Sequence, residues 1–185
     1  MSKFWYWDSA KKPFIYSLIL AVIIFSIMVW IVNKPNKEAN IIQHKPNGVY
    51  EWMLVKSEMP EEVLKHIQKT TNKYENRDLL LAIIKVESHF NPSAKSSQDA
   101  RGLMGIIPKW WLDVLIKNKI IKSKRDLYDV EKNIAAGNFI LGKYFEKYKD
   151  IYEVLDKYSG GHKGYSERVF VAMGEINYAR MKGKW

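Results

Sequence analysis

Glu87 is the residue of this sequence best placed for acid–base chemistry. It ends a nearly all-apolar stretch, residues 79–86, whose pattern predicts a buried helix. Positions three, four and seven before it on a helix are Ile84, Ile83 and Leu80, so its carboxyl group would project from the most apolar face. Burial and the negative end of the helix dipole both raise the pKa of a carboxyl group. A carboxyl group that stays partly protonated near neutral pH can serve as a general acid.

A glutamate near a helix end is most often a solvated surface residue. A catalytic role for Glu87 therefore depends on the residues that follow it. They form an ordered set of motifs: Glu87-Ser88, Asn91-Pro92, Ala94, Arg101-Gly102-Leu103-Met104, Pro108, Asn133-Ile134-Ala135-Ala136-Gly137, Tyr158-Ser159-Gly160-Gly161, Tyr165 and Arg168-Val169. This set, over residues 76–180, resembles the lytic transglycosylase domain of the soluble type (SLT), a goose-lysozyme-like family that cleaves peptidoglycan.

The resemblance implies an all-α, lysozyme-like fold and a mechanism that depends on one glutamate. Glu87 would protonate the oxygen that bridges N-acetylmuramic acid and N-acetylglucosamine, while the 2-acetamido group supports the positive sugar carbon. Glu87 would then accept the proton of the sugar's own C6 hydroxyl. The product would be a 1,6-anhydro sugar, formed without water and without a metal or organic cofactor.

The resemblance also assigns substrate-binding roles to Ser88, Met104, Tyr158 and Tyr165. Structural roles stay open for all four: Ser88 can be an ordinary helix-end serine, and Met104 and the two tyrosines can be core residues. Asn133 is better explained as a buried, buttressing amide than as a ligand.

Three positions depart from the family pattern. Gly105 stands where the family usually has glutamine, Ser159 replaces the usual asparagine, and His162 follows Gly161 in place of a typical continuation. These departures predict an activity that is weakened, shifted in sugar register or dependent on a partner.

Two other classes of function stay open beside the lytic one. A water-using muramidase on the same fold would need a second acid at a water's distance from Glu87, and Asp99 is the candidate. A non-catalytic wall-binding scaffold of an envelope machine would need no acid. Nucleic-acid binding is supported only by charge, and His44, His66, His89 and His162 lack the spacing of a metal site.

Length, charge and cysteine content bound the possibilities further. The 185 residues leave room for a membrane segment, a linker and one domain. The absence of cysteine excludes disulfides, thiolate metal sites and a lipid-modified cysteine anchor. The net charge of +10 suits an anionic partner, although the lysines are spread widely enough to form a solvated surface.

The N-terminal segment predicts a membrane anchor. No charged residue occurs in residues 13–32, and a helix of that length would span about 30 Å, the thickness of a bilayer core. We divide the chain into a tail (1–12), a transmembrane anchor (13–32), a linker (33–59) and a lytic transglycosylase-like domain (60–185). The lysines on either side favour an internal N-terminus only slightly. We expect the chain in the bacterial inner membrane with its domain on the periplasmic side, because the expected substrate, peptidoglycan, lies there. By family analogy, the partners would be glycan strands, the membrane and an envelope secretion or assembly machine.

The remaining pattern predicts helices almost throughout the domain. Only residues 49–55 alternate like a strand, and we expect this element to pack on the domain. Asn76, Asp129 and Asp150 are expected to cap helices. Gly137 and Gly142 suggest close helix contacts, and of the adjacent Trp110 and Trp111 one is expected in the core and the other at a groove.

Overall fold

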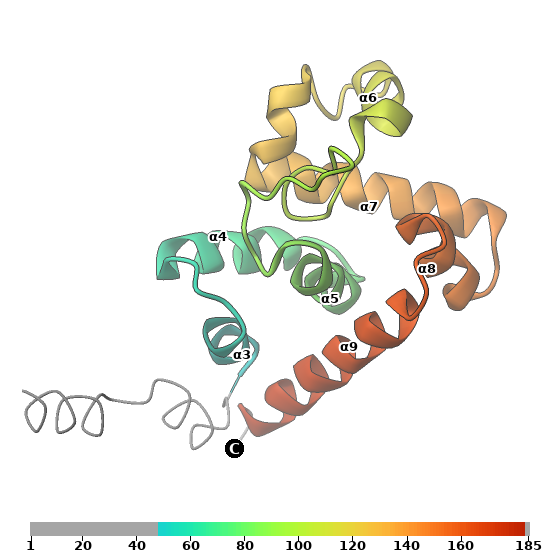
Figure 1. Ribbon diagram of the computed structural model, residues 1–185. Helices are drawn as coiled ribbons and strands as arrows, with labels where there is room; N and C mark the ends of the chain where they lie inside the picture. Colours follow the sequence, from blue (N-terminus) through green and yellow to red (C-terminus); the bar gives the residue numbers. More distant parts are fainter. Residues whose placement is uncertain (1–47, 184–185) are drawn as a thin grey trace, which may run out of the picture. The chain divides into compact units, whose positions relative to one another are not determined.

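Helices form nearly all of the regular structure in the computed structural model, which describes residues 48–183 (Figure 1). Within these residues the only bridges of β type pair Arg101 with Lys95 and with Ile106, in the loop that precedes α6. The all-α prediction is therefore confirmed for the part of the chain that the structure describes. The helices are α3 (Val49–Val55), α4 (Glu61–Thr71), α5 (Arg77–Ser88), α6 (Pro108–Lys117), the 3₁₀ helix η1 (Lys124–Tyr128), α7 (Val130–Lys147), α8 (Ile151–Ser159) and α9 (Tyr165–Lys182).

The central helix of the domain is α5, which packs against α4, α7 and α9 (Figure 1). Every residue from Leu79 to Ile84 is buried, as the apolar run predicts. A helix buried all round has a fixed position, because each of its faces is held by another helix. The last turn of α5, which contains Glu87, is therefore held in place as well.

The helix α3 replaces the strand-like element expected at residues 49–55. Its adjacent Trp52 and Met53 are both buried, and it packs on α4 and α9, so the expected packing on the domain is confirmed. Trp52 Nε1 donates a hydrogen bond to Glu175 Oε2 at 3.0 Å, and Lys56 Nζ pairs with Glu175 Oε1 at 2.8 Å. Burying two neighbours in sequence suits a helix that is covered on two sides, whereas a half-buried strand would expose one of them.

Two of the three expected helix caps are present. The Asp129 side chain accepts a hydrogen bond from Lys132 N at 2.9 Å, and the Asp150 side chain accepts one from Tyr152 N at 3.1 Å. The prediction for Asn76 is wrong, because its side chain makes no cap bond and donates to Asn138 Oδ1 at 3.0 Å. A partner on α7 competes successfully for this amide, which local sequence cannot foresee.

The two glycines of α7 also differ. A β-carbon at Gly137 would collide with the Met104 side chain, so a close contact is present there, although its partner is the loop before α6 and not a helix as expected. Gly142 is exposed and has nothing within 4 Å of a β-carbon, so the same expectation is wrong for it.

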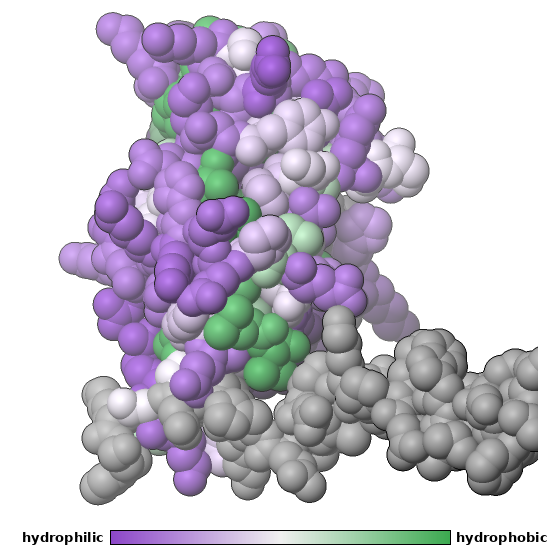
Figure 2. All heavy atoms as spheres, turned by 90° about the vertical axis from the view of Figure 1, so that its left-hand side faces the viewer, coloured by the Kyte–Doolittle hydropathy of each residue, from purple (hydrophilic) through white to green (hydrophobic). Residues whose placement is uncertain are grey.

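No helix within residues 48–183 is long and apolar enough to cross a membrane. The predicted anchor at residues 13–32 lies outside the described residues. The face drawn in Figure 2 is largely hydrophilic with a limited apolar strip, as expected for a solvated, lysine-rich surface.

Candidate active site

Glu87 lies in the last turn of α5, which ends at Ser88, before the helix-disfavouring pair Asn91-Pro92. The helix ends early because His89 and Phe90 both have left-handed backbones, with φ of 51° and 66°. Contacts with the segment around α3 hold this turn. Ser57 Oγ donates to His89 O at 3.2 Å, and the buried Phe90 ring meets the Trp52 ring edge-on with centroids 5.7 Å apart.

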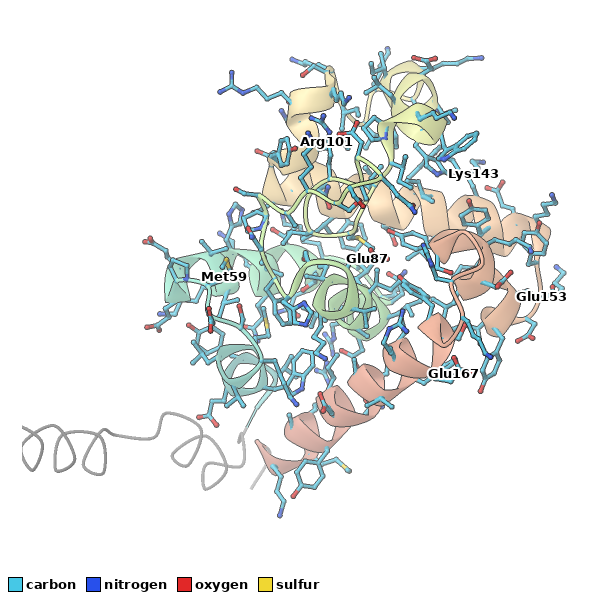
Figure 3. The ribbon with its side chains drawn as sticks, viewed as in Figure 1. Met59, Glu87, Arg101, Lys143, Glu153 and Glu167 are labelled. Atoms are coloured by element: carbon cyan, nitrogen blue, oxygen red, sulfur yellow. The ribbon has the colours of Figure 1, made fainter. Side chains whose placement is uncertain are left out.

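The surroundings of Glu87 favour its protonated form. Burial raises the pKa of this carboxyl group, while the Tyr165 hydroxyl and the Arg168 guanidinium lower it in part. In Figure 3, Glu87 lies near the middle of the domain, between α5 and the loop that leads to α6. The structure therefore supports the predicted direction of the pKa shift, and it adds a nearby cation that stabilises the ionised form.

Gly105 allows the loop backbone to approach the carboxyl group of Glu87. Its φ is +60°, and a β-carbon at this position would collide with Glu87 Oε2. From the sequence alone, Gly105 indicates only that the glutamine side chain usual in the family is missing. In the structure, no side chain fits at this position while Glu87 keeps its present rotamer.

Asn133 and Tyr158 fix the loop beside Glu87. Tyr158 Oη donates to Met104 O at 2.8 Å, and Met104 N donates to Asn133 Oδ1 at 2.8 Å. Asn133 Nδ2 also donates to Leu127 O at 2.7 Å and to Arg101 O at 3.1 Å. The buttressing role predicted for Asn133 is confirmed, because this buried amide uses both of its ends on the backbone.

Both predicted tyrosines lie at the acid. Burial, followed by the nearby Glu87 carboxylate, raises the pKa of Tyr158 and that of Tyr165, so both hydroxyls stay neutral and can donate hydrogen bonds. The Tyr165 hydroxyl is buried and has no hydrogen-bond partner of good geometry within residues 48–183. It nevertheless lies close enough to Glu87 to lower the pKa of that carboxyl group.

Glu87 opens into a groove made of two adjoining cavities. The cavity with Glu87 has a volume of about 390 Å³, and a second one of about 560 Å³ lies beside it. Glu87 is the only carboxylate among the described residues that line either cavity. The two cavities share Gln98, Gly105, Ile107, Tyr158, Ser159 and His162.

Ser88 and Met104 line neither cavity in the described part of the chain. Ser88 is buried and its Oγ donates back to Ile84 O at 3.0 Å. The Met104 side chain is fully buried against Gly137, and its backbone carbonyl accepts the hydrogen bond of Tyr158, which lines the groove. Their roles in substrate binding stay predictions, and the structure shows them supporting the residues that do line the groove.

Asp99, the candidate second acid, also lines neither cavity. It forms ion pairs at 2.8 Å with both Arg101 and Lys124 and a longer one, at 3.7 Å, with Lys95. Hydrogen bonds from Lys124 and Arg101 lower the pKa of Asp99 to about 2. Figure 3 shows Arg101, one of its partners, well apart from Glu87.

The sequence pattern assigns no site role to several residues that line the groove. Gln98 and His162 line both cavities, and Arg168 lines the one with Glu87. Only for Arg168 does the sequence indicate a place at the groove, because it follows Tyr165 by three positions and so lies on the same helix face. No group of three or more His, Cys, Asp or Glu among residues 48–183 is arranged to hold a metal ion.

The comparison with known families agrees with this geometry. The pattern of the family described as Transglycosylase SLT domain matches residues 65–169, which include Glu87, both tyrosines and Asn133. The chain belongs to the transglycosylase SLT domain family. No solved structure matches the chain significantly.

Several curated relatives of this SLT chain share one name. Membrane-bound lytic murein transglycosylase C of Photorhabdus laumondii is 33% identical over 147 residues, which are 66% of this chain and 40% of the relative. The proteins of that name from Yersinia pestis and Yersinia pseudotuberculosis are each 32% identical over 145 residues, with the same shares. The matching region thus spans about two fifths of the length of these relatives.

Proposed function

We propose that this chain is a peptidoglycan lytic transglycosylase that acts through Glu87. One observation carries the proposal: among residues 48–183, a single carboxyl group, with a pKa raised by burial, faces a groove of sugar-sized cavities. Membership of the SLT family and the name of the relatives support the reaction class. The lysozyme-like arrangement of the helices belongs to the same proposal.

Glu87 would act first as an acid and then as a base. Its proton passes to the bridging oxygen as the bond from that oxygen to C1 of N-acetylmuramic acid breaks, and the 2-acetamido group supports the developing positive charge. The Glu87 carboxylate then removes the C6 hydroxyl proton while the C6 oxygen bonds to C1. This step closes the 1,6-anhydro ring and restores the protonated glutamate, so no water enters.

The neighbours of Glu87 suit both halves of this cycle. Burial stabilises the protonated form before bond cleavage. Arg168 and the Tyr165 hydroxyl stabilise the carboxylate that exists between the two steps. Tyr158, bonded to Met104 O, holds the loop wall in place. Such opposing influences keep both states of one residue accessible.

Hydrolysis on the same fold has less support. It requires a second carboxylate to activate water, and Asp99 is ion-paired outside both cavities. A non-catalytic scaffold would have no need of an acid whose pKa is raised by burial beside a groove.

The cellular setting is part of the proposal. Residues 13–32 would anchor the chain in the bacterial inner membrane, with the catalytic domain on the periplasmic side where peptidoglycan lies. The relatives are named membrane-bound, which supports a membrane location. An envelope secretion or assembly machine is the proposed partner.

Digestion of purified peptidoglycan sacculi by the full chain tests the activity. Mass spectrometry of the released fragments should find 1,6-anhydro ends with the unchanged protein and no release with Glu87→Gln. Glu153→Gln is the matched control, because Glu153 is exposed on α8 and lines neither cavity. Reducing ends would identify a hydrolase. Equal release by Glu87→Gln would show that Glu87 is not the catalytic acid.

A further inference from the structure

Two helices of the described part of the chain, α6 and α9, each carry three exposed large apolar side chains. On α6, Trp110 is exposed at the groove while its neighbour Trp111 packs against the core, so the division expected for this pair is confirmed, although both line the larger cavity. On α9 the three are Val171, Tyr178 and Met181, with exposed fractions of 64%, 40% and 60%. None of them lines either cavity among residues 48–183, so the groove does not account for them.

The exposed side chains of α9 form a stripe along the helix. Val171, Gly174, Tyr178 and Met181 follow one another at intervals of three and four residues, which places them on one face, called here the α9 stripe. A separate apolar face of α9 packs in the core and consists of Tyr165, Val169, Ala172, Ile176 and Ala179. A surface helix normally needs one apolar face and is polar elsewhere, so a second apolar face indicates a contact outside the domain.

The chain brings a membrane within reach of this stripe. The predicted anchor ends at residue 32, and residues 33–47, which lead from it to the domain, can extend over about 50 Å at most. The domain begins with α3, which packs on α9, and in Figure 1 the start of α3 lies beside the C-terminal end of α9. The connection to the anchor therefore joins the domain close to one end of the stripe.

The residues around the stripe have the chemistry of a bilayer surface. Lys182 Nζ lies 5.8 Å from the centroid of the Tyr178 ring, and Lys184 and Trp185 follow in the sequence. Such side chains place an apolar body toward the acyl chains and keep their polar ends in water, and lysines also attract anionic head groups. The one acid in residues 171–185, Glu175, is already paired with Lys56.

A second copy of the chain fits this face less well than a bilayer does. Three partly exposed side chains supply less than the roughly 800 Å² per partner that a stable protein interface buries. A tethered domain needs a much smaller contact, because the anchor already raises its effective concentration at the membrane.

We propose that the α9 stripe docks the domain on the surface of the bilayer in which the chain is anchored. Val171, Tyr178 and Met181 enter the boundary between head groups and acyl chains, and Lys182 contacts anionic head groups. This inference rests on the membrane location given under the proposed function and not on the lytic reaction.

Docking through the stripe would orient the groove. Tyr165 and Arg168, which influence the carboxyl group of Glu87, lie in the first turns of the same helix. Met181 follows Arg168 by about 20 Å along the helix axis. A bilayer contact on one face of this rigid helix would therefore fix the height and direction of the groove relative to the membrane.

Spin labels on the full chain test the contact, and the absence of natural cysteines allows single labels. Gly174→Cys labels the stripe and keeps its apolar side chains. Gly142→Cys on α7 is the matched control, because both glycines are exposed in helices and have nothing within 4 Å of a β-carbon.

The measurement compares collisions of each label with oxygen, which concentrates in lipid, and with a nickel chelate, which stays in water. In vesicles of phosphatidylethanolamine and phosphatidylglycerol, the oxygen-to-nickel ratio should be several-fold higher at position 174 than at position 142. Adding Val171→Ser and Met181→Ser should remove this difference.

Equal ratios at the two positions would overturn the proposal. Low accessibility of position 174 to both reagents would also overturn it, because protein and not lipid would then cover the stripe. Release of the chain from vesicles by alkaline carbonate would refute the membrane anchor and this inference together, without bearing on the lytic reaction. Lipid contact in a protein that frees no fragments from sacculi would support the docking and refute only the proposed activity.

Discussion

Two carboxylates, Glu87 in the last turn of α5 and Asp99 in the loop between α5 and α6, have opposite surroundings. Glu87 is partly buried at the end of an apolar helix, and burial raises its pKa. Asp99 is more than one-third exposed among Lys95, Arg101 and Lys124, and its pKa falls to about 2. The side-chain chemistry is nearly the same, so the difference comes from the neighbours.

The contrast explains why the groove can work with one acid. A group with a pKa of about 2 is ionised near neutral pH and has no proton to donate. Asp99 instead pairs with the cations of its loop and with Lys124, while burial shifts Glu87 toward its protonated form.

Neutralising each acid should separate the two roles most clearly. Glu87→Gln should lower the release of soluble fragments from sacculi by at least about 1,000-fold, since a positioned general acid is lost. Asp99→Asn should leave the rate within about threefold, because surface ion pairs contribute little. Comparable losses in the two variants would contradict the division of roles.

Gly105→Ala tests whether the close approach of the loop sets the position of Glu87. The added methyl group would displace the carboxyl group and strain a left-handed backbone, and we expect activity to fall by about 100-fold. Gly142→Ala is the control, because Gly142 is exposed on α7 and an added methyl group meets nothing within 4 Å. Its free energy of unfolding should rise by about 0.5–1 kcal/mol, since alanine favours the helix over glycine. Full activity in Gly105→Ala would show that the acid tolerates another rotamer.

Arg168→Gln should shift the pH profile of Glu87. Because the guanidinium lowers the pKa of Glu87, its removal raises that pKa further. In the proposed mechanism the reaction begins from protonated Glu87, so the alkaline limb of the activity profile should move to higher pH. Asp99→Asn should leave this limb in place, and a downward shift in Arg168→Gln would contradict the assigned electrostatics.

The smallest effect concerns stability against pH. Asp99 has a lowered pKa in the folded protein, so its ion pairs stabilise the fold above its ordinary pKa of 3.8 and cease to do so as pH falls toward about 2. Urea unfolding of Asp99→Asn should therefore show a modest loss at neutral pH that disappears in this window. Glu87→Gln should behave oppositely: because the folded pKa of Glu87 is raised, the unchanged protein loses stability relative to the variant as pH rises through that pKa.

Local sequence patterns predict the helices of the domain and the position of the acid. The apolar run before Glu87, the caps Asp129 and Asp150, and the buttress Asn133 are all found as expected. In each case neighbouring residues in the sequence carry the physical cause.

Other features depend on contacts between distant residues. The partner of Asn76 on α7, the ion pairs that remove Asp99 from the groove and the proximity of Arg168 to Glu87 are all set by packing. The early end of α5 similarly depends on Trp52 and Ser57, which precede α5 in the chain and hold the His89–Phe90 turn. These contacts join residues that are far apart in the sequence, so local sequence patterns do not predict them.

Titration of the carboxyl carbons by NMR measures the contrast directly. In the full chain labelled at Asp and Glu side-chain carboxyls, the Glu87 signal is assigned by its loss in Glu87→Gln and the Asp99 signal by its loss in Asp99→Asn. We predict that Glu87 titrates above its ordinary pKa of 4.5 and that Asp99 titrates at about 2. A Glu87 pKa at or below 4.5 would contradict the claim that burial keeps the catalytic proton in place.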